Sequence, residues 1–184
     1  VRYAAQLLAG AQRPLIMAGG GVTASGVQQE VIELAEMLSI PVATSLNAKG
    51  TIPEDHRLSV GVCGSYSRAC ANRAVSEADL VLFIGSHTGS QVTLDWKIPA
   101  MGTPVIQIDI DPSELGRSYP ATVAMQGDAK ASLRRLIEAM EPMGDRFGWV
   151  DRCEQLVNEW RESVAPAANS DAVPIRPERI CAEL

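Results

Sequence analysis

Two loops in this chain combine small residues with groups that could hold a phosphorylated ligand. Gly19-Gly20-Gly21-Val22-Thr23-Ala24 fits the pattern G-x-G-x-x-G/A, after an apolar run and before an amphipathic stretch. Gly85-Ser86-His87 follows a second apolar run. Glycine permits a tight turn, and free backbone N–H groups at a helix start attract a diphosphate. The first motif therefore indicates a nucleotide turn, with a glycine turn that only packs a helix against a sheet as the open alternative.

Three aspartates mark the ends of predicted strands or the starts of predicted helices. Asp109 could bind a ribose, and Asp128 could reach an adenine or a backbone amide. Asp111 and Asp128 are also explained as helix caps. The second predicted strand ends in Thr44-Ser45-Leu46, where a dehydrogenase-type dinucleotide site needs an acid for the ribose. An NAD-dependent dehydrogenase is therefore disfavoured.

The sequence offers no evident catalytic constellation. It has no G-x-S-x-G elbow, and neither His56 nor His87 has an obvious nucleophile. The four cysteines form no C-x-x-C pair, and two histidines are too few to complete a common zinc set. We predict no catalytic residue and no metal ligand within this chain.

Short apolar runs and amphipathic stretches must position these loops. Two apolar runs are too short for ordinary helices and too continuous for half-solvated strands, which predicts strands buried on both faces: Ala78–Ser86, with its strand at Leu80–Ile84, and Val105–Pro112. Alternation with helices predicts an α/β fold with a doubly wound, mostly parallel, Rossmann-like sheet and helices on both faces. The other predicted strands are Pro14–Ala18, Pro41–Thr44 and Val123–Met125, and the predicted helices are Tyr3–Leu8, Gly26–Leu38 with Ser25 as N-cap, Ala69–Glu77, a helix starting at Asp111-Pro112-Ser113-Glu114, one from Asp128 through Met140, and Trp149–Val164.

Length and composition limit the classes of function. The length of 184 residues and the composition along the chain predict one domain over 1–164, a linker over 165–173, and a tail over 174–184 that begins another, truncated domain. The start at Val1 and the helix-like end predict a piece of a longer polypeptide. A net charge of −6 disfavours nucleic acid and anionic membranes as partners, and no apolar run approaches the ~20 residues of a membrane span. The cysteines predict reduced thiols in a cytoplasmic protein.

Several segments, taken in order, resemble the central domain of the thiamin diphosphate (TPP)-dependent enzymes of the acetolactate synthase and pyruvate oxidase group. Together they cover most of residues 1 to 140. The tail from Pro174 resembles the entry into the carboxy-terminal, TPP-binding domain of that group. The matching segments are Arg13–Gly21, Pro41–Leu46, Lys49-Gly50, Pro53–His56, Ala71–Val75 with Ala78-Asp79, Ile108–Pro112 and Gly127–Lys130.

The resemblance implies a fold of the DHS-like NAD/FAD-binding type for this domain, and a role for the parent protein. In that group the catalytic glutamate lies in the amino-terminal domain, and the Mg²⁺ and diphosphate ligands lie in the carboxy-terminal one. The parent would thus be a homo-oligomeric 2-keto acid decarboxylase or carboligase, and this domain its scaffold and a vestigial adenine-nucleotide site. The partners of this domain would be its own amino- and carboxy-terminal neighbours. The alternative is a non-catalytic nucleotide-binding or regulatory module on the same fold.

The resemblance also places cofactor contacts on this sequence. The FAD-binding synthases carry two arginines after the glycine that corresponds to Gly85, and His87 and Gln91 replace them here. Because charged hydrogen bonds to a diphosphate are stronger than neutral ones, FAD is not expected, and ADP is the nucleotide that the remaining groups could hold. The implied cofactor-binding residues are Gly19, Gly20, Gly21, Ser45, Leu46, Gly64, Gly85, Ser86, His87, Asp109, Ile110, Asp128 and Ala129.

Overall fold

A computed structural model describes residues 1–141 and 146–183, and within these residues six strands form one parallel sheet. The sheet order is β3-β2-β1-β4-β5-β6, the order of a doubly wound dinucleotide-binding fold. The predicted fold class is therefore confirmed. The strands are β1 (Pro14–Ala18), β2 (Val42–Thr44), β3 (Ser59–Val62), β4 (Leu80–Ile84), β5 (Val105–Asp109) and β6 (Val123–Gln126).

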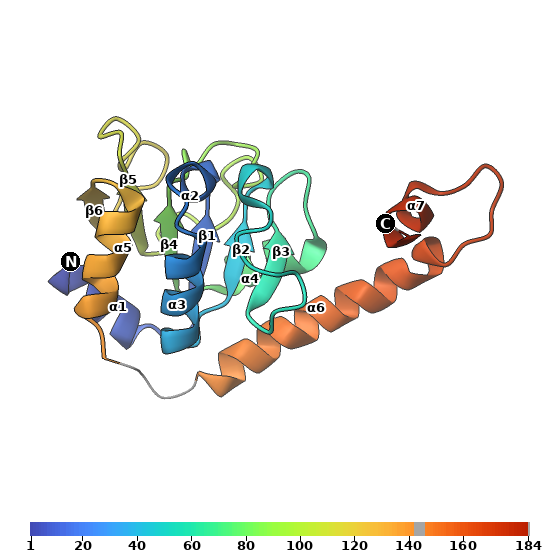
Figure 1. Cartoon of the computed structure of the whole chain (residues 1–184), viewed down its shortest axis with the longest axis horizontal. Helices are drawn as coiled ribbons and strands as arrows, with labels where there is room; N and C mark the ends of the chain where they lie inside the picture. Colours follow the sequence, from blue (N-terminus) through green and yellow to red (C-terminus); the bar gives the residue numbers. More distant parts are fainter. Residues whose placement is uncertain (142–145, 184) are drawn as a thin grey trace.

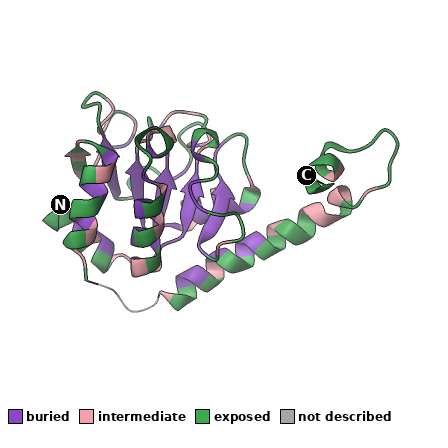
Figure 2. Cartoon of the chain, in the orientation of Figure 1, coloured by how far each residue is buried: buried purple, intermediate pink, exposed green. Residues whose placement is uncertain are grey.

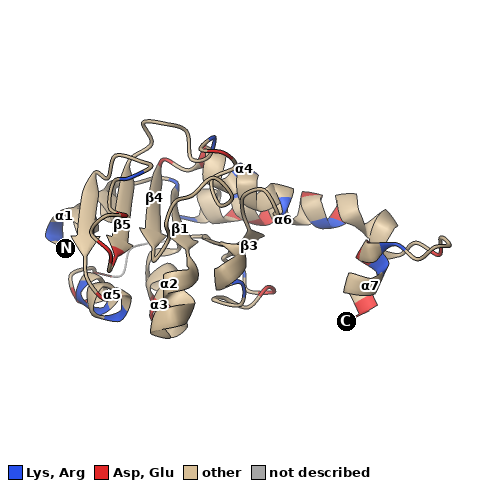
Figure 3. Ribbon diagram, turned by 90° about the horizontal axis from the view of Figure 1, so that it is seen from above, with Lys and Arg blue, Asp and Glu red and all other residues tan. Residues whose placement is uncertain are grey.

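Helices cover both faces of this sheet, as Figure 3 shows from above. One face packs against α1 (Arg2–Gly10), α2 (Gly20–Ser25), α3 (Gln28–Leu38) and α5 (Ala129–Glu138). The other packs against α4 (Ala69–Glu77) and the first half of α6 (Phe147–Ala168). Alternate residues of each central strand supply the two cores, so the strands are buried on both faces (Figure 2).

The end of the chain extends away from this body (Figure 1). α6 continues to Ala168, four residues past its predicted end, with Pro166 inside the helix. α7 (Pro177–Glu183) follows and buries none of its described residues. The division into a domain over 1–164, a linker and a tail stays a prediction, and of those ranges residues 142–145 and Leu184 lie outside the described residues. No helix in the described part of the chain is long and apolar enough to cross a membrane.

Three local predictions differ from the structure. Gly26, at φ 61°, ends α2 in the left-handed conformation, so Ser25 caps nothing and α3 begins separately at Gln28. No helix follows Asp111, because its carboxylate accepts hydrogen bonds from the Ser113 N–H at 2.8 Å and the Ser113 hydroxyl at 2.7 Å in a local turn. Strand β3 was not predicted, since its sequence Ser-Val-Gly-Val contains too few apolar residues for a buried run.

Candidate functional site

The sheet order reverses between β1 and β4, and the loops that leave these two strands part there in opposite directions. Open α/β sheets bind their ligands outside the carboxyl ends of the strands at such a point. β1 leads through Gly19 into α2, and β4 leads through Gly85 into a long loop over the same edge. Both glycine motifs named from the sequence therefore lie at this edge.

The glycines of these loops are in direct backbone contact. A Cβ atom on Gly19 would lie 2.2 Å from the Gly85 carbonyl oxygen, and one on Gly21 would lie 2.7 Å from the Gly85 Cα. The Gly19 N–H donates to the Ile84 carbonyl at 2.8 Å, and the Gly21 N–H donates to the Gly85 carbonyl at 2.9 Å. The two backbones approach so closely that no side chain fits at Gly19 or Gly21. These contacts therefore support the alternative that the glycines serve packing. We call this contact the glycine interlock.

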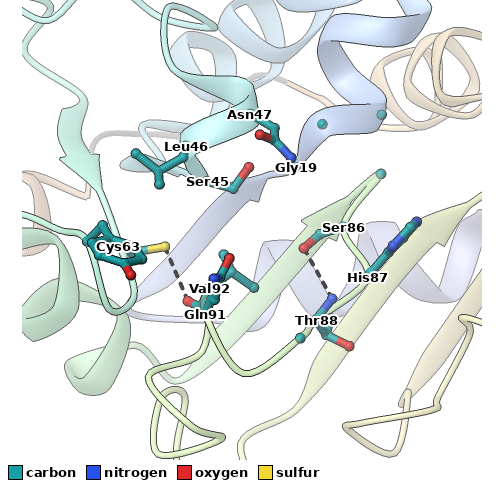
Figure 4. A pocket seen from close by; sticks show the side chains of 15 residues that line it. Gly19, Ser45, Leu46, Asn47, Cys63, Ser86, His87, Thr88, Gln91 and Val92 are labelled. Atoms are coloured by element: carbon teal, nitrogen blue, oxygen red, sulfur yellow. Dashed lines mark hydrogen bonds between the residues drawn. The ribbon is translucent and has the colours of Figure 1, made fainter.

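A pocket of about 370 Å³ opens beside the glycine interlock. Figure 4 shows Ser45, Leu46 and Asn47 along one side, with Cys63, Gln91, Val92 and the loop after β4 across from them. The volume lies at the low end of the range for small-ligand sites. The lining residues are Gly19, Gly20, Gly21, Ser45, Leu46, Asn47, Cys63, Tyr66, Gly85, Ser86, His87, Thr88, Gly89, Gln91 and Val92.

The pocket brings together one part of the predicted site and leaves out the other. Gly64 lies just beyond it, packed so closely that a Cβ atom there would be 1.9 Å from the Gln91 carbonyl oxygen. The residues at the ends of β5 and β6 are also outside the lining. The predicted residues that line it are Gly19, Gly20, Gly21, Ser45, Leu46, Gly85, Ser86 and His87, and those that do not are Gly64, Asp109, Ile110, Asp128 and Ala129.

The residues at the ends of β5 and β6 mainly serve the local backbone. One Asp109 oxygen, Oδ1, accepts from the Asp111 N–H at 3.0 Å, while Oδ2 is buried and has no partner among the described residues. Asp128 Oδ1 accepts from the Ala131 N–H at 2.9 Å, which confirms the predicted cap of α5. Ile110 is exposed, and Ala129, the first residue of α5, is buried. Hydrogen bonding to Ser113 lowers the pKa of Asp111 below its usual range.

The described lining of the pocket has no side chain of fixed charge. Within the described residues, no Lys, Arg, Asp or Glu lines it, and His87 is exposed. Burial raises the pKa of the Cys63 thiol to about 12, so this sulfur stays protonated and donates toward the Val92 carbonyl at 3.5 Å. A thiol in that state is not a nucleophile. Across residues 1–141 and 146–183, no group of three or more His, Cys, Asp or Glu side chains could hold a metal ion.

Sequence reasoning missed several lining residues. They come from loops that follow β2, β3 and β4, and the sequence gives them no motif. The position of each loop at the carboxyl edge is the signal that could have found them, once β3 is recognised as a strand. The missed residues are Asn47, Cys63, Tyr66, Thr88, Gly89 and Val92, while Gln91 was identified only as the replacement of an arginine and not as a binding residue.

Comparisons with known proteins give one consistent result. The family model described as "Thiamine pyrophosphate enzyme, central domain" matches residues 1–136. A probable acetolactate synthase large subunit of Methanocaldococcus jannaschii is 39% identical, over 100% of this chain and 31% of the relative, and one of Methanococcus aeolicus is 36% identical, over 100% and 32%. An acetolactate synthase large subunit of Corynebacterium glutamicum is 36% identical, over 82% of this chain and 25% of the relative. The chain thus spans about a third of the length of the first two relatives.

Proposed function

The chain belongs to the thiamine pyrophosphate enzymes, whose central domain it matches, and on this premise we propose that it is the central third of an acetolactate synthase-type large subunit. The parent would decarboxylate a 2-keto acid and join the remaining acyl unit to a second keto acid. The observation that carries this proposal is the match of the entire chain to acetolactate synthase large subunits. The same match favours an enzyme domain over the regulatory-module alternative.

The residues of this chain do not fit thiamin diphosphate itself. A magnesium-bound diphosphate needs carboxylate or carbonyl ligands in a suitable group, and the described residues contain no such cluster of acidic or histidine side chains. Thiamin diphosphate supplies the carbanion chemistry of such a reaction when it is bound. We therefore assign that cofactor and Mg²⁺ to the amino- and carboxy-terminal domains, and the scaffold role to this one.

The pocket at the glycine interlock does not fit FAD either. A dinucleotide is large for a pocket of about 370 Å³, and the described lining provides no arginine or lysine for its diphosphate. Only the weaker of the two nucleotide assignments remains, which is loose binding of an adenine nucleotide such as ADP. The proposed parent is a homo-oligomer, as the resemblance implies, and cytoplasmic, which the free thiols Cys63, Cys70, Cys153 and Cys181 support.

Activity of the full-length parent tests the proposal. The parent, purified with thiamin diphosphate and Mg²⁺, should convert two molecules of pyruvate into acetolactate and CO₂, while this chain alone should release no CO₂. Turnover by this chain alone would contradict the scaffold role. A full-length parent that folds and binds thiamin diphosphate but leaves pyruvate and other 2-keto acids unchanged would contradict the enzyme assignment.

A further inference from the structure

One contact marks the point at which α6 leaves the body of the domain. The buried side chains of this helix end at Val157, and none of residues 158–168, which the structure describes in full, is buried. Trp160 is partly buried against the core below α4, and its ring centroid lies 4.6 Å from the guanidinium carbon of Arg68. This distance allows a cation–π interaction. Arg68 and Trp160 therefore form the outermost of these contacts between α6 and the body, and beyond them the helix extends as an arm (Figure 1).

The side chain of Arg68 is held in one place. Its backbone starts α4, where the Arg68 N–H donates to the Val62 carbonyl at 2.9 Å and the Arg68 carbonyl accepts from the Ala71 N–H at 3.0 Å. A Cβ atom on Gly61 would lie 2.7 Å from Arg68 Cδ, so the arginine stem lies directly against the edge strand β3. Little rotamer freedom remains to be lost when the guanidinium binds its partners.

The same guanidinium reaches the loop between β2 and β3. Arg68 Nη2 donates to Glu54 Oε2, and Lys49 Nζ lies 3.4 Å from Glu54 Oε1. Burial raises the pKa of the Glu54 carboxyl group, but the hydrogen bonds and charges of Arg68 and Lys49 outweigh this effect and lower the pKa below its usual range. Glu54 is therefore charged at neutral pH and joins the two cations.

Lys49 connects this ion pair to a stiff part of the loop. It follows the 3₁₀ helix η1 (Leu46–Ala48) at the carboxyl edge of the sheet. The Ala48 carbonyl accepts from the Thr51 N–H at 3.0 Å and from the Thr51 hydroxyl at 2.7 Å, and Thr51 is buried. A force on Glu54 therefore acts on a hydrogen-bonded turn and not on a slack segment.

Contacts thus run without a break from α6 to this loop, through Trp160, Arg68, Glu54 and Lys49. We propose that Arg68 is a positioning residue that couples the α6 arm to the loop 46–54, so that releasing either one loosens the other. The bland alternative is a set of independent surface contacts, each with a small and local effect. In the proposed parent, this path would connect the segment after α6 with the carboxyl edge. Only that consequence rests on the proposed function, because the coupling itself lies within this chain.

Amide hydrogen exchange of this chain tests the coupling in both directions, since a coupling free energy is reciprocal. Trp160→Leu should speed exchange of the loop amides, that of Thr51 included, by about twofold to fivefold, although Arg68 makes the contact to the loop. Glu54→Gln should speed exchange of the α6 amides over 158–163 by a similar factor. Amides of β4 report global unfolding and should be unchanged in both variants.

Arg161→Gln is the matched control, because Arg161 is an exposed arginine on α6 without an ion pair to the described residues. It should change exchange neither in the loop nor, beyond its own turn, in α6. If Trp160→Leu affected only α6, or Glu54→Gln only the loop, the coupling would be refuted. Pyruvate turnover by the full-length parent does not enter this test, so the proposal and the proposed function can fail separately.

A double variant shows that the coupling passes through Arg68. Contacts that share one side chain are not additive, so Trp160→Leu in an Arg68→Gln background should speed loop exchange by less than about 1.5-fold. A further rise of about twofold or more would mean that Trp160 acts by another route, and would overturn the role of Arg68. A cooperative thermal transition confirms that each variant folds. Should Arg68→Gln fail to fold, the reciprocal effects of Trp160→Leu and Glu54→Gln decide the proposal.

Discussion

The two halves of the carboxyl edge of the sheet differ in how they use their residues. At the β1–β4 half, backbones lock together through glycines, and a neutral pocket remains beside them. At the β5–β6 half, Asp109, Asp111 and Asp128 carry charge, yet each accepts hydrogen bonds from its own neighbouring backbone. A motif-based reading expects both halves to share one phosphorylated ligand. The contacts show that these glycines and aspartates serve the local backbone, apart from Asp109 Oδ2, which is buried without a partner in the described structure.

The strongest test of this comparison removes the glycine interlock. Gly19→Ala should lower the free energy of unfolding by about 3 kcal/mol or more, because its Cβ would lie 2.2 Å from one backbone atom and 2.6 Å from another. Gly20→Ala should cost no more than about 1 kcal/mol, since its Cβ would meet only the Asn47 side chain, at 3.2 Å. Urea unfolding measures both. Equal effects would show that the interlock does not hold the two loops.

Gly10→Ala controls for the substitution itself. A Cβ on this glycine meets nothing within 4 Å, and Gly10 lies in α1. Replacing a helical glycine with alanine should leave the chain unchanged or stabilise it by about 0.5–1 kcal/mol. A large loss of stability here would mean that the effect at Gly19 is not specific.

A second test adds charge to the neutral half. The double variant His87→Arg and Gln91→Arg should tighten ADP at least about tenfold, because each new charged hydrogen bond to a diphosphate contributes about 1.5–3 kcal/mol before losses to solvent. Glu138→Arg changes the net charge by the same two units on the exposed side of α5 and should leave ADP affinity nearly unchanged. Calorimetry measures both. A similar gain in the control would mean that net charge, and not the pocket, limits ADP binding.

The sequence identified the strands better than it identified the pocket. Leu80–Ile84 was predicted with the observed bounds, and β5 lies within the longer run Val105–Pro112 that was predicted as a strand, because a short continuous apolar run is typical of a strand buried in a parallel sheet. Gly26 and Asp111 were misread, since a left-handed turn and a side-chain turn depend on single torsion angles and contacts. Asn47 and Gln91 line the same pocket because of the sheet order, although they are 44 positions apart in the chain, so no local pattern could pair them.

A third test compares the carboxyl edge with an ion pair between two helices, α4 and α6, that cover one face of the sheet. Glu77 on α4 accepts two hydrogen bonds from Arg152 on α6, at 3.0 Å each, and these lower the pKa of Glu77 to about 2. A lowered pKa in the folded state stabilises the fold above the ordinary carboxyl pKa of 4.5, and this contribution is lost as the pH falls from there toward 2. The loss should be about 1–2 kcal/mol after screening by solvent.

Glu77→Gln should therefore flatten the decline of unfolding free energy between pH 4.5 and 2, followed by urea titrations across that range. Glu33→Gln is the control, because Glu33 is an exposed carboxyl group on α3. A wild-type decline that persists unchanged in Glu77→Gln would show that other carboxyl groups govern the acid transition.

The test with the smallest expected effect asks whether Asp128, at the β5–β6 half, caps α5 or contacts a ligand. Asp128→Ala removes the acceptor for the Ala131 N–H and should cost about 1 kcal/mol of unfolding free energy. Asp128→Asn keeps an oxygen that can cap α5 equally well, so it should restore that stability although the charge is gone. Neither variant should change ADP affinity, because Asp128 lies outside the pocket. If Asp128→Asn lost stability like Asp128→Ala, the charge and not only the cap would stabilise α5; if either variant weakened ADP, Asp128 would contact the ligand and the two halves would form one site.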